Sequence, residues 1–297
     1  MLDRRSIAAV ASAVALAASL TTAQSAAQAA DLSKYPDLKG QWARVGGPNW
    51  IQPKDVPQFH PVYDPRAYLP PPPGLLTPEY QAIYEANRAD QAAGGVGDVP
   101  STFCIPQGMP MMMDLYDPME IVVTPDITYI LISHVNDSYR RIYTDGRDWP
   151  QDAEPTYAGY SIGRWIDEEG DGHYDVLEVE TRNFKGPRAY DASGLPLARD
   201  DQSVIKERIH LDKADRNTIY DDITVIDHAL TRPLSLTRKA VRNPNRRPIW
   251  RTETCPADNS WIRIGETAYY MSADGNLMPT KKDQAPPDLK YFKQPGK

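Results

Sequence analysis

The stretch "EIVVTPDITYILIS", residues 120–133, decides the fold class of this chain. It is rich in β-branched residues, which favour β-strands. Further runs of the same kind follow it, with turn residues between them and no helical pattern, and this arrangement predicts an antiparallel meander that closes as a barrel or packs as a sandwich. The runs are "YRRIYT" (139–144), "YAGYSIGRWI" (157–166), "YDVLEVET" (174–181), "SVIKERIHL" (203–211), "TIYDDITVI" (218–226), "LSLTRKAV" (234–241) and "PIWRTE" (248–253).

The segment before these runs has a different character. Residues 31–76 are rich in proline and end in "LPPPPG" (69–74), which predicts an irregular, extended arm. Thr77-Pro78-Glu79 then has the residues of a helix start, and Gly94-Gly95 those of a helix end. We therefore expect one helix over 77–93, opening a single barrel-like domain over 77–297.

Residues 1–30 have the features of a secretory signal peptide. Arg4 and Arg5 precede an alanine-rich apolar run, and small residues lie before Asp31. The adjacent arginines also fit a twin-arginine signal, so both export routes stay open. The sequence predicts a periplasmic or secreted protein. Because the signal carries one acidic and two basic residues, its loss changes the net charge from −7 to −8.

Composition narrows the class of partner. The acidic balance and the absence of a basic stripe argue against nucleic acid. No second long apolar run exists, so no membrane span is expected after signal removal. The chain has 17 Tyr and 6 Trp but only 4 Phe, which suits half-buried sheets and wet pockets. We expect a small-molecule ligand or substrate, and the oligomeric state stays open.

The chain has two cysteines, Cys104 and Cys255, both in the part expected to be exported. An even number of cysteines in an oxidising compartment predicts a disulfide. The loop that it closes would be worth up to roughly 4–5 kcal/mol in the chain-entropy model. Two buried thiols are the alternative.

The run "HVNDSYRRIYTDGRDWP" (134–150) holds the candidate catalytic residues. A two-residue turn at Asn136-Asp137, followed by a tight turn at Asp145-Gly146, would place one set of side chains on a single face. That set is His134, Tyr139, Arg141 and Tyr143, together with Ile130 and Ile132. If this face lines a barrel interior, it forms an apolar cavity with a few polar groups. The alternative is a solvated outer face on which arginine stacks on tyrosine.

We assign chemical roles to this face. His134 can act as a base, Arg141 can hold a carboxylate or enolate, and Tyr143 can donate to a developing oxyanion. A buried arginine needs an acidic partner. Glu207 is the candidate, because it is the one acid in the alternating set Ile205, Glu207, Ile209 and Leu211. Tyr139, Tyr160 and Trp165 are the predicted ligand-binding residues.

Three other motifs, two of them described here and the third in the next paragraph, give weaker indications of function. Gly159-Tyr-Ser161-Ile-Gly163 fits the G-x-S-x-G pattern of serine hydrolases, but no β-α alternation surrounds it. Met109-Pro-Met-Met-Met113 could offer thioethers to Cu(I), although methionine commonly fills gaps in a core. The five histidines show no metal-binding spacing, so no zinc site is expected.

An acidic stretch matches the spacing of a twelve-residue Ca²⁺ loop. Its candidate ligands are Asp167, Glu169, Asp171, Asp175 and Glu178, with Gly172 at the sixth position. Both flanks resemble strands rather than the helices of an EF-hand. We therefore expect a solvent-exposed hairpin connection, with Ca²⁺ as the alternative and no other cofactor.

The sequence also resembles known families. "RRIYTDGR" (140–147), "GYSIGRW" (159–165) and the segment Cys104–Pro110 resemble a family of exported, uncharacterised bacterial proteins over roughly residues 100–260. This resemblance implies export and a β-rich fold, and it implies no catalytic residue. In that family the chain passes from the tryptophan almost directly to a short turn, so the acidic stretch would be an insertion. Gly40-x-Trp42 resembles the first-strand signature of lipocalin barrels, which implies a calycin-like barrel.

Two classes of function follow from these observations. The first is an exported barrel that binds a small apolar or aromatic molecule and acts on it by acid–base chemistry, as a cofactor-independent lyase or isomerase with His134 as base. The second is a non-catalytic binding protein or a Ca²⁺-stabilised surface module. The sequence leaves open whether the protein is an enzyme.

Overall fold

The computed structural model describes most of the chain after the predicted signal peptide. The residues that it describes are 32–45, 71–93, 95, 97, 100–114, 117–134, 136–189, 194–250, 252, 255, 260–265, 267–272, 274–281 and 283–287. Met1–Ser33 and Lys34–Lys297 form separate units. The predicted signal peptide and most of the predicted arm, 46–70, lie outside the described residues.

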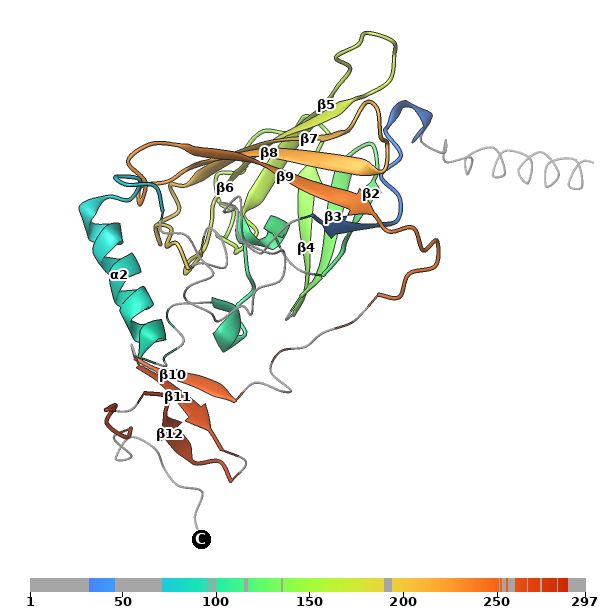
Figure 1. Cartoon of the computed structure of the whole chain (residues 1–297). Coiled ribbons are helices and arrows are strands. Elements are labelled where there is room, and N and C mark those ends of the chain that lie inside the picture. The colour runs from blue at the N-terminus through green and yellow to red at the C-terminus, as the bar shows by residue number, and fades with distance from the viewer. Residues whose placement is uncertain are drawn as a thin grey trace, which may run out of the picture. The chain divides into compact units, whose positions relative to one another are not determined.

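Nine strands form a closed barrel in which each strand pairs with its neighbour in sequence and β1 pairs with β9. Figure 1 shows these strands curving from the green β2–β4 to the orange β9. The predicted mainly β barrel is therefore confirmed. The strands are β1 (Gln41–Arg44), β2 (Met119–Val123), β3 (Ile127–His134), β4 (Asn136–Tyr143), β5 (Tyr160–Ile166), β6 (Val176–Arg182), β7 (Val204–Leu211), β8 (Thr218–Ile226) and β9 (Leu234–Arg242).

One pair of neighbours, β4 and β5, is parallel, and the purely antiparallel meander predicted from the sequence is wrong at this pair. The reason is geometric. Strands that alternate in direction can close a ring only when their number is even, so nine strands need a parallel pair. The chain meets this need with the long connection 144–159, and Asp145-Gly146 is consequently not a tight hairpin turn.

The barrel interior is filled mainly by aliphatic side chains. Residues alternate between the two faces of each strand, and every second residue is buried. The set predicted to point inward on β7 is buried, including Glu207. The least exposed apolar side chains inside the barrel include Trp42, Ile130, Ile132, Ile142, Leu177, Ile205, Ile223 and Val225.

The segment predicted as an irregular arm contributes to the barrel. Gln41–Arg44 forms β1 and closes the ring between β2 and β9, because it supplies the backbone groups that both edges need. A short 3₁₀ helix, η1 (Leu32–Lys34), precedes it. Farther on, Leu76 bridges to Leu230 before the helix begins.

The predicted helix is α2 (Pro78–Ala92), with Thr77 at its N-cap and Pro78 at its first position. Two short 3₁₀ helices follow it, η2 (Pro100–Phe103) and η3 (Met111–Asp114). Among the described residues, no helix is long and apolar enough to cross a membrane.

A separate sheet follows the barrel in sequence. It contains β10 (Trp261–Ile264), β11 (Thr267–Met271) and β12 (Leu277–Pro279), all antiparallel. The guanidinium carbon of Arg263 lies 4.2 Å from the ring centroid of Phe103, so a cation–π contact connects β10 to η2. The sequence analysis did not anticipate this second sheet.

Candidate functional site

The β3–β4 hairpin pairs in a register that differs from the predicted one. Ile130 lies opposite Arg140. A two-residue turn at Asn136-Asp137 would instead have placed Ile132 opposite Arg141. The two registers differ by an odd number of residues, and an odd shift exchanges the faces of a strand. The predicted face is therefore wrong: Arg140 points into the barrel, while Arg141 is exposed on the outside.

Arg140 forms a buried ion pair with Glu207. Its Nη1 donates to Glu207 Oε1 at 2.8 Å, and its Nη2 donates to Oε2. Its Nε donates to Ser161 Oγ at 3.1 Å, and Nη2 also donates to Thr181 Oγ1 at 2.7 Å. Arg140 is 1% exposed and Glu207 is 2% exposed. The expectation that Glu207 pairs with a buried cation holds, but the cation is Arg140 rather than Arg141.

A second acid, Asp221 on β8, is buried beside this pair. Burial raises the pKa of Asp221 well above its usual value, and the negative charge of Glu207 raises it further, while Arg140 opposes the shift. A side-chain hydrogen bond with Glu207 also raises the pKa of Asp221. The raised pKa favours the acid form of Asp221, whose side chain lines an interior cavity.

The four residues of η3 close one side of that cavity as a plug. All of them are buried. Arg44 Nη1 donates to Asp114 Oδ1 at 3.4 Å, and Arg238 forms an ion pair with the same oxygen. Burial and then the charge of Arg44 lower the pKa of Arg238 to about 9, so its guanidinium remains charged at neutral pH. The carboxylate of the plug therefore contacts two cations of the barrel wall.

The cavity itself is small and mainly apolar. Its volume is about 30 Å³. A buried water needs roughly 10–15 Å³, so the space holds about two water molecules. Two methionines of the plug, Met112 and Met113, form part of its wall. Its other apolar walls are Trp42, Met119, Ile121, Ile130, Ile132, Ile209, Ile219 and Ala240, and its polar walls include Arg44, Asp117, Asp221 and Arg238.

His134 lies at the edge of this region, on the same side of β3 as Ile130 and Ile132. Its Nδ1 is 2.7 Å from Asp117 Oδ2, and Asp117 lines the cavity. Both side chains are partly exposed. A histidine held by a carboxylate in this way has a fixed ring orientation and can accept a proton at its other nitrogen.

Two other predicted catalytic residues, Arg141 and Tyr143, belong to a different cluster on the outer face. The guanidinium of Arg141 lies over the rings of Tyr129 and Tyr143, with distances of 5.7 and 5.2 Å to their centroids. Tyr143 also stacks on Tyr160 at 4.9 Å. This is the stacked outer face that the sequence analysis gave as the alternative. The expectation that His134, Arg141 and Tyr143 face one cavity is wrong.

The predicted ligand-binding residues do not come together either. Tyr139 is 63% exposed on β4, and Tyr160 belongs to the outer stack. Trp165 packs against the core, with its ring 5.5 Å from Tyr35 and 6.3 Å from Tyr174. Tyr160 and Trp165 lie an odd number of residues apart on β5, so the alternation of a strand places them on opposite faces.

The acidic stretch connects β5 and β6 as an exposed hairpin loop, as predicted. Asp167 accepts hydrogen bonds from the backbone N–H groups of Gly170, Asp171 and Gly172. Glu178 pairs with two arginines of neighbouring strands. In the described residues no group of three or more metal-ligating side chains converges. Asp167 thus stabilises a tight turn, and Glu178 joins cross-strand ion pairs.

The remaining two motifs belong to the barrel wall and the plug. Ser161 lies within strand β5 with its hydroxyl bonded to Arg140 and Thr181, not on a strand–turn–helix elbow. Gly163 allows a close approach, because a Cβ there would lie 2.7 Å from the side chain of Ile142. Met109–Met113 is buried, which is the gap-filling role of methionine.

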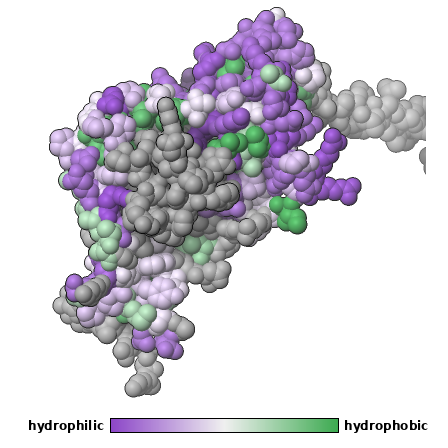
Figure 2. Space-filling view, in the orientation of Figure 1, coloured by the Kyte–Doolittle hydropathy of each residue, from purple (hydrophilic) through white to green (hydrophobic). Residues whose placement is uncertain are grey.

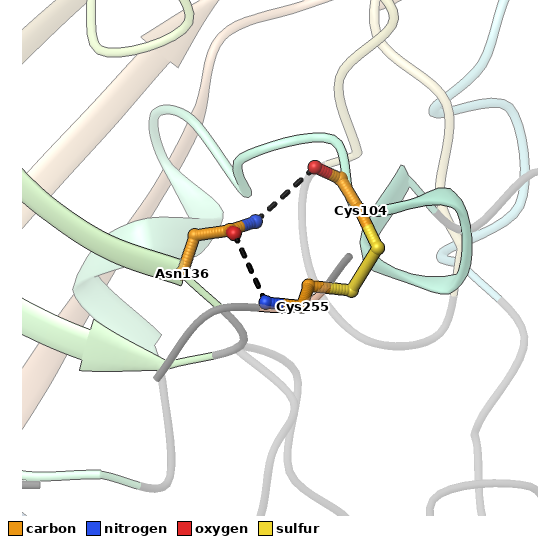
Figure 3. The surroundings of a disulfide bond; sticks show 3 residues. All are labelled: Cys104, Asn136 and Cys255. Atoms are coloured by element: carbon orange, nitrogen blue, oxygen red, sulfur yellow. Dashed lines mark hydrogen bonds between the residues drawn. A yellow bond between two sulfur atoms is a disulfide. The ribbon is translucent and has the colours of Figure 1, made fainter. Parts of the chain in front are cut away.

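Cys104 and Cys255 form the predicted disulfide, with their Cα atoms 5.4 Å apart. Asn136 holds the two ends together: its Nδ2 donates to Cys104 O at 3.1 Å, and its Oδ1 accepts from Cys255 N at 3.3 Å (Figure 3). Asn136, predicted as a turn residue, instead fastens the start of β4 to this bond.

The surface offers a second hollow of opposite character. A cleft of about 900 Å³ lies between the segments 34–40, 169–175 and 242–248 and is lined largely by charged and amide side chains. The face of the molecule in Figure 2 is mostly hydrophilic, with scattered hydrophobic residues. Apolar walls combined with buried charge thus distinguish the barrel interior as the candidate site.

No protein-family model matches the chain, and neither a curated protein nor a solved structure matches it.

Proposed function

We propose that this protein binds a small, mainly apolar molecule inside its barrel, outside the cytoplasm. The observation that carries the proposal is the interior cavity with its aliphatic walls and a few inward-facing polar groups. Small-molecule sites commonly have this make-up, with apolar walls for affinity and a few polar groups for orientation. The predicted signal peptide and the disulfide support an exported protein.

A ligand larger than two water molecules needs more room than the cavity has. Met112 and Met113 stand where such a ligand would extend. Methionine side chains are unbranched and adapt easily to a new neighbour, so the plug is the wall most able to move. Binding would therefore rearrange η3 and leave the β-strands in place.

Binding of Nile red, a neutral apolar dye, tests this proposal. Ile219→Trp fills the cavity from β8, and we expect it to weaken dye binding by at least about tenfold through steric overlap. Val122→Trp on the exposed face of β2 is the matched control and should leave the affinity unchanged.

Far-UV circular dichroism establishes that both variants fold. If Ile219→Trp does not fold, Ile121→Phe replaces it, because it fills less of the same cavity. Equal dye affinity in the wild type and in a folded cavity-filling variant would contradict interior binding.

The His134–Asp117 pair favours a second candidate function, acid–base chemistry on the bound molecule. His134 would act as the base, with Asp117 orienting its ring, in a cofactor-independent lyase or isomerase. Arg141 and Tyr143 have no part in this proposal, because they lie on the outer face. Glu207 is ion-paired with Arg140, so it would contribute only its charge to the barrel interior.

Deuterium exchange from D₂O into a bound carbon acid tests this chemistry. His134→Ala should abolish the exchange and leave ligand binding and the thermal midpoint nearly unchanged. His228→Ala is the matched control, because His228 Nδ1 contacts Asp200 Oδ2 at 2.9 Å on the surface. If exchange persists in His134→Ala, His134 is not the base, and the proposal of ligand binding stands without this chemistry.

A further inference from the structure

We propose that the plug is an internal substitute for the ligand, and that the ligand it imitates is an aliphatic carboxylate. This inference rests on the proposed function, and it names the class of molecule and the way in which the empty protein is held closed. The plug presents apolar side chains followed by a carboxylate, which is the chemistry of a fatty acid.

The first support is the position of Asp114. Its side chain is 0% exposed and shares one oxygen between Arg44 and Arg238, which lie on β1 and β9. These two strands are neighbours in the closed barrel. The pair of arginines thus forms a cation site built into the wall, and the plug, which is not a strand of the barrel, supplies its anion.

The second support is the charge that would remain if the plug moved away. Arg44 and Arg238 would be left in an apolar interior without Asp114. Loss of an anion from beside two buried cations is unfavourable, so a carboxylate should displace the plug more readily than a neutral molecule of the same size. A carboxylate ligand replaces the lost anion, and exchange of one carboxylate for another leaves the interior charge unchanged.

Asp221 adds a third group to the same site. It lies opposite Arg238 in the β8–β9 pairing and lines the cavity together with Arg44 and Arg238. A carboxyl group in its acid form can donate one hydrogen bond. Two arginines and a carboxyl group that line one cavity suit the two oxygens of a carboxylate.

The attachment of the plug is compatible with its release. The backbone N–H groups of Met112 and Met113 donate to Gly108 and Pro110 of the same segment. Met109 N donates to Tyr157 O at the base of the plug. Asp114 contacts the barrel wall through side-chain ion pairs, which a ligand carboxylate can replace.

Calorimetric titration with dodecanoate and with dodecanol tests the inference. The two probes share their chain and differ in the carboxylate. Asp114→Asn removes the competing anion, so it should raise the affinity for dodecanoate at least about tenfold and change that for dodecanol little. Adding Arg238→Gln to Asp114→Asn should abolish the preference for dodecanoate. Asp126→Asn, an exposed acid on the β2–β3 turn, is the control.

Thermal unfolding covers the case in which Asp114→Asn weakens the fold. Dodecanoate should then raise the midpoint of Asp114→Asn by more than that of the wild type, because it restores the missing anion. Equal binding of both probes, unchanged by Asp114→Asn, would overturn this inference while leaving the proposed function intact. Failure of both probes and of Nile red to bind any variant would overturn the proposed function itself.

Discussion

Arg140 and Arg141 are adjacent arginines of one strand, yet the structure places them in opposite environments. Arg140 is buried in the barrel, where Glu207, Ser161 and Thr181 satisfy its guanidinium. Arg141 is exposed and lies over Tyr129 and Tyr143. The same side chain thus serves as the cation of a buried network and as a stacked surface group.

The two arginines differ in how many strands must be in place to satisfy them. A buried arginine needs partners from several strands at once, and those of Arg140 come from β5, β6 and β7. Surface stacking needs only neighbours on the same hairpin. Loss of the inner arginine should therefore affect the whole barrel, whereas loss of the outer one should affect a local contact.

The largest expected effect is that of Arg140→Ala. It leaves the carboxylate of Glu207 buried without its cation, which should lower the free energy of unfolding by about 3–5 kcal/mol. Urea unfolding measures the loss. The double variant Arg140→Met/Glu207→Leu leaves no unpaired charge and should lose less than Arg140→Ala. If the double variant loses more than the single one, the ion pair itself is the source of stability.

An intermediate effect is expected for Asp221→Asn, and it should depend on pH. The folded-state pKa of Asp221 is raised above its unfolded value. The folded state therefore binds the proton more tightly, and its stability falls as pH rises from the ordinary carboxyl range through the raised pKa.

We thus expect the thermal midpoint of the wild type to fall relative to that of Asp221→Asn between pH 4 and pH 8, through the range just described. Asp126→Asn, which replaces an exposed acid, is the control. Its thermal midpoint should differ from that of the wild type by a constant amount over the same pH range. A difference between wild type and Asp221→Asn that stays constant over this range would show that Asp221 does not hold a proton in the fold.

The smallest expected effect is that of Arg141→Ala. Cation–π contacts at exposed sites contribute about 0.5–1 kcal/mol, so the free energy of unfolding should fall by no more than about 1 kcal/mol. Urea unfolding under the conditions used for Arg140→Ala gives the comparison directly. A loss as large as that of Arg140→Ala would remove the distinction between the two faces.

Several features could be predicted from residue type and spacing alone. The β-rich runs indicated a barrel, Thr77-Pro78 marked the helix start, and two cysteines in a chain expected to be exported indicated the disulfide. The alternating set around Glu207 identified an inward-facing acid. Each of these predictions depends on local chemistry or on the two-residue period of a strand.

The candidate site required the tertiary structure. The period of a strand shows which residues share a face, but not which strand lies opposite or in what register. An odd shift in the β3–β4 pairing exchanged Arg141 for Arg140 inside the barrel. The methionine plug could not be anticipated, because its role depends on Arg44 and Arg238, which lie far from Asp114 in sequence and meet it only when the barrel closes.

The fold class, the helix and the disulfide therefore follow from composition and short-range pattern. The parallel β4–β5 pair, the inward arginine and the interior cavity depend instead on contacts between distant segments. The physical reason is that closure of a nine-stranded ring and pairing of buried charges are long-range conditions. They select one register and one set of partners from the many that the local pattern allows.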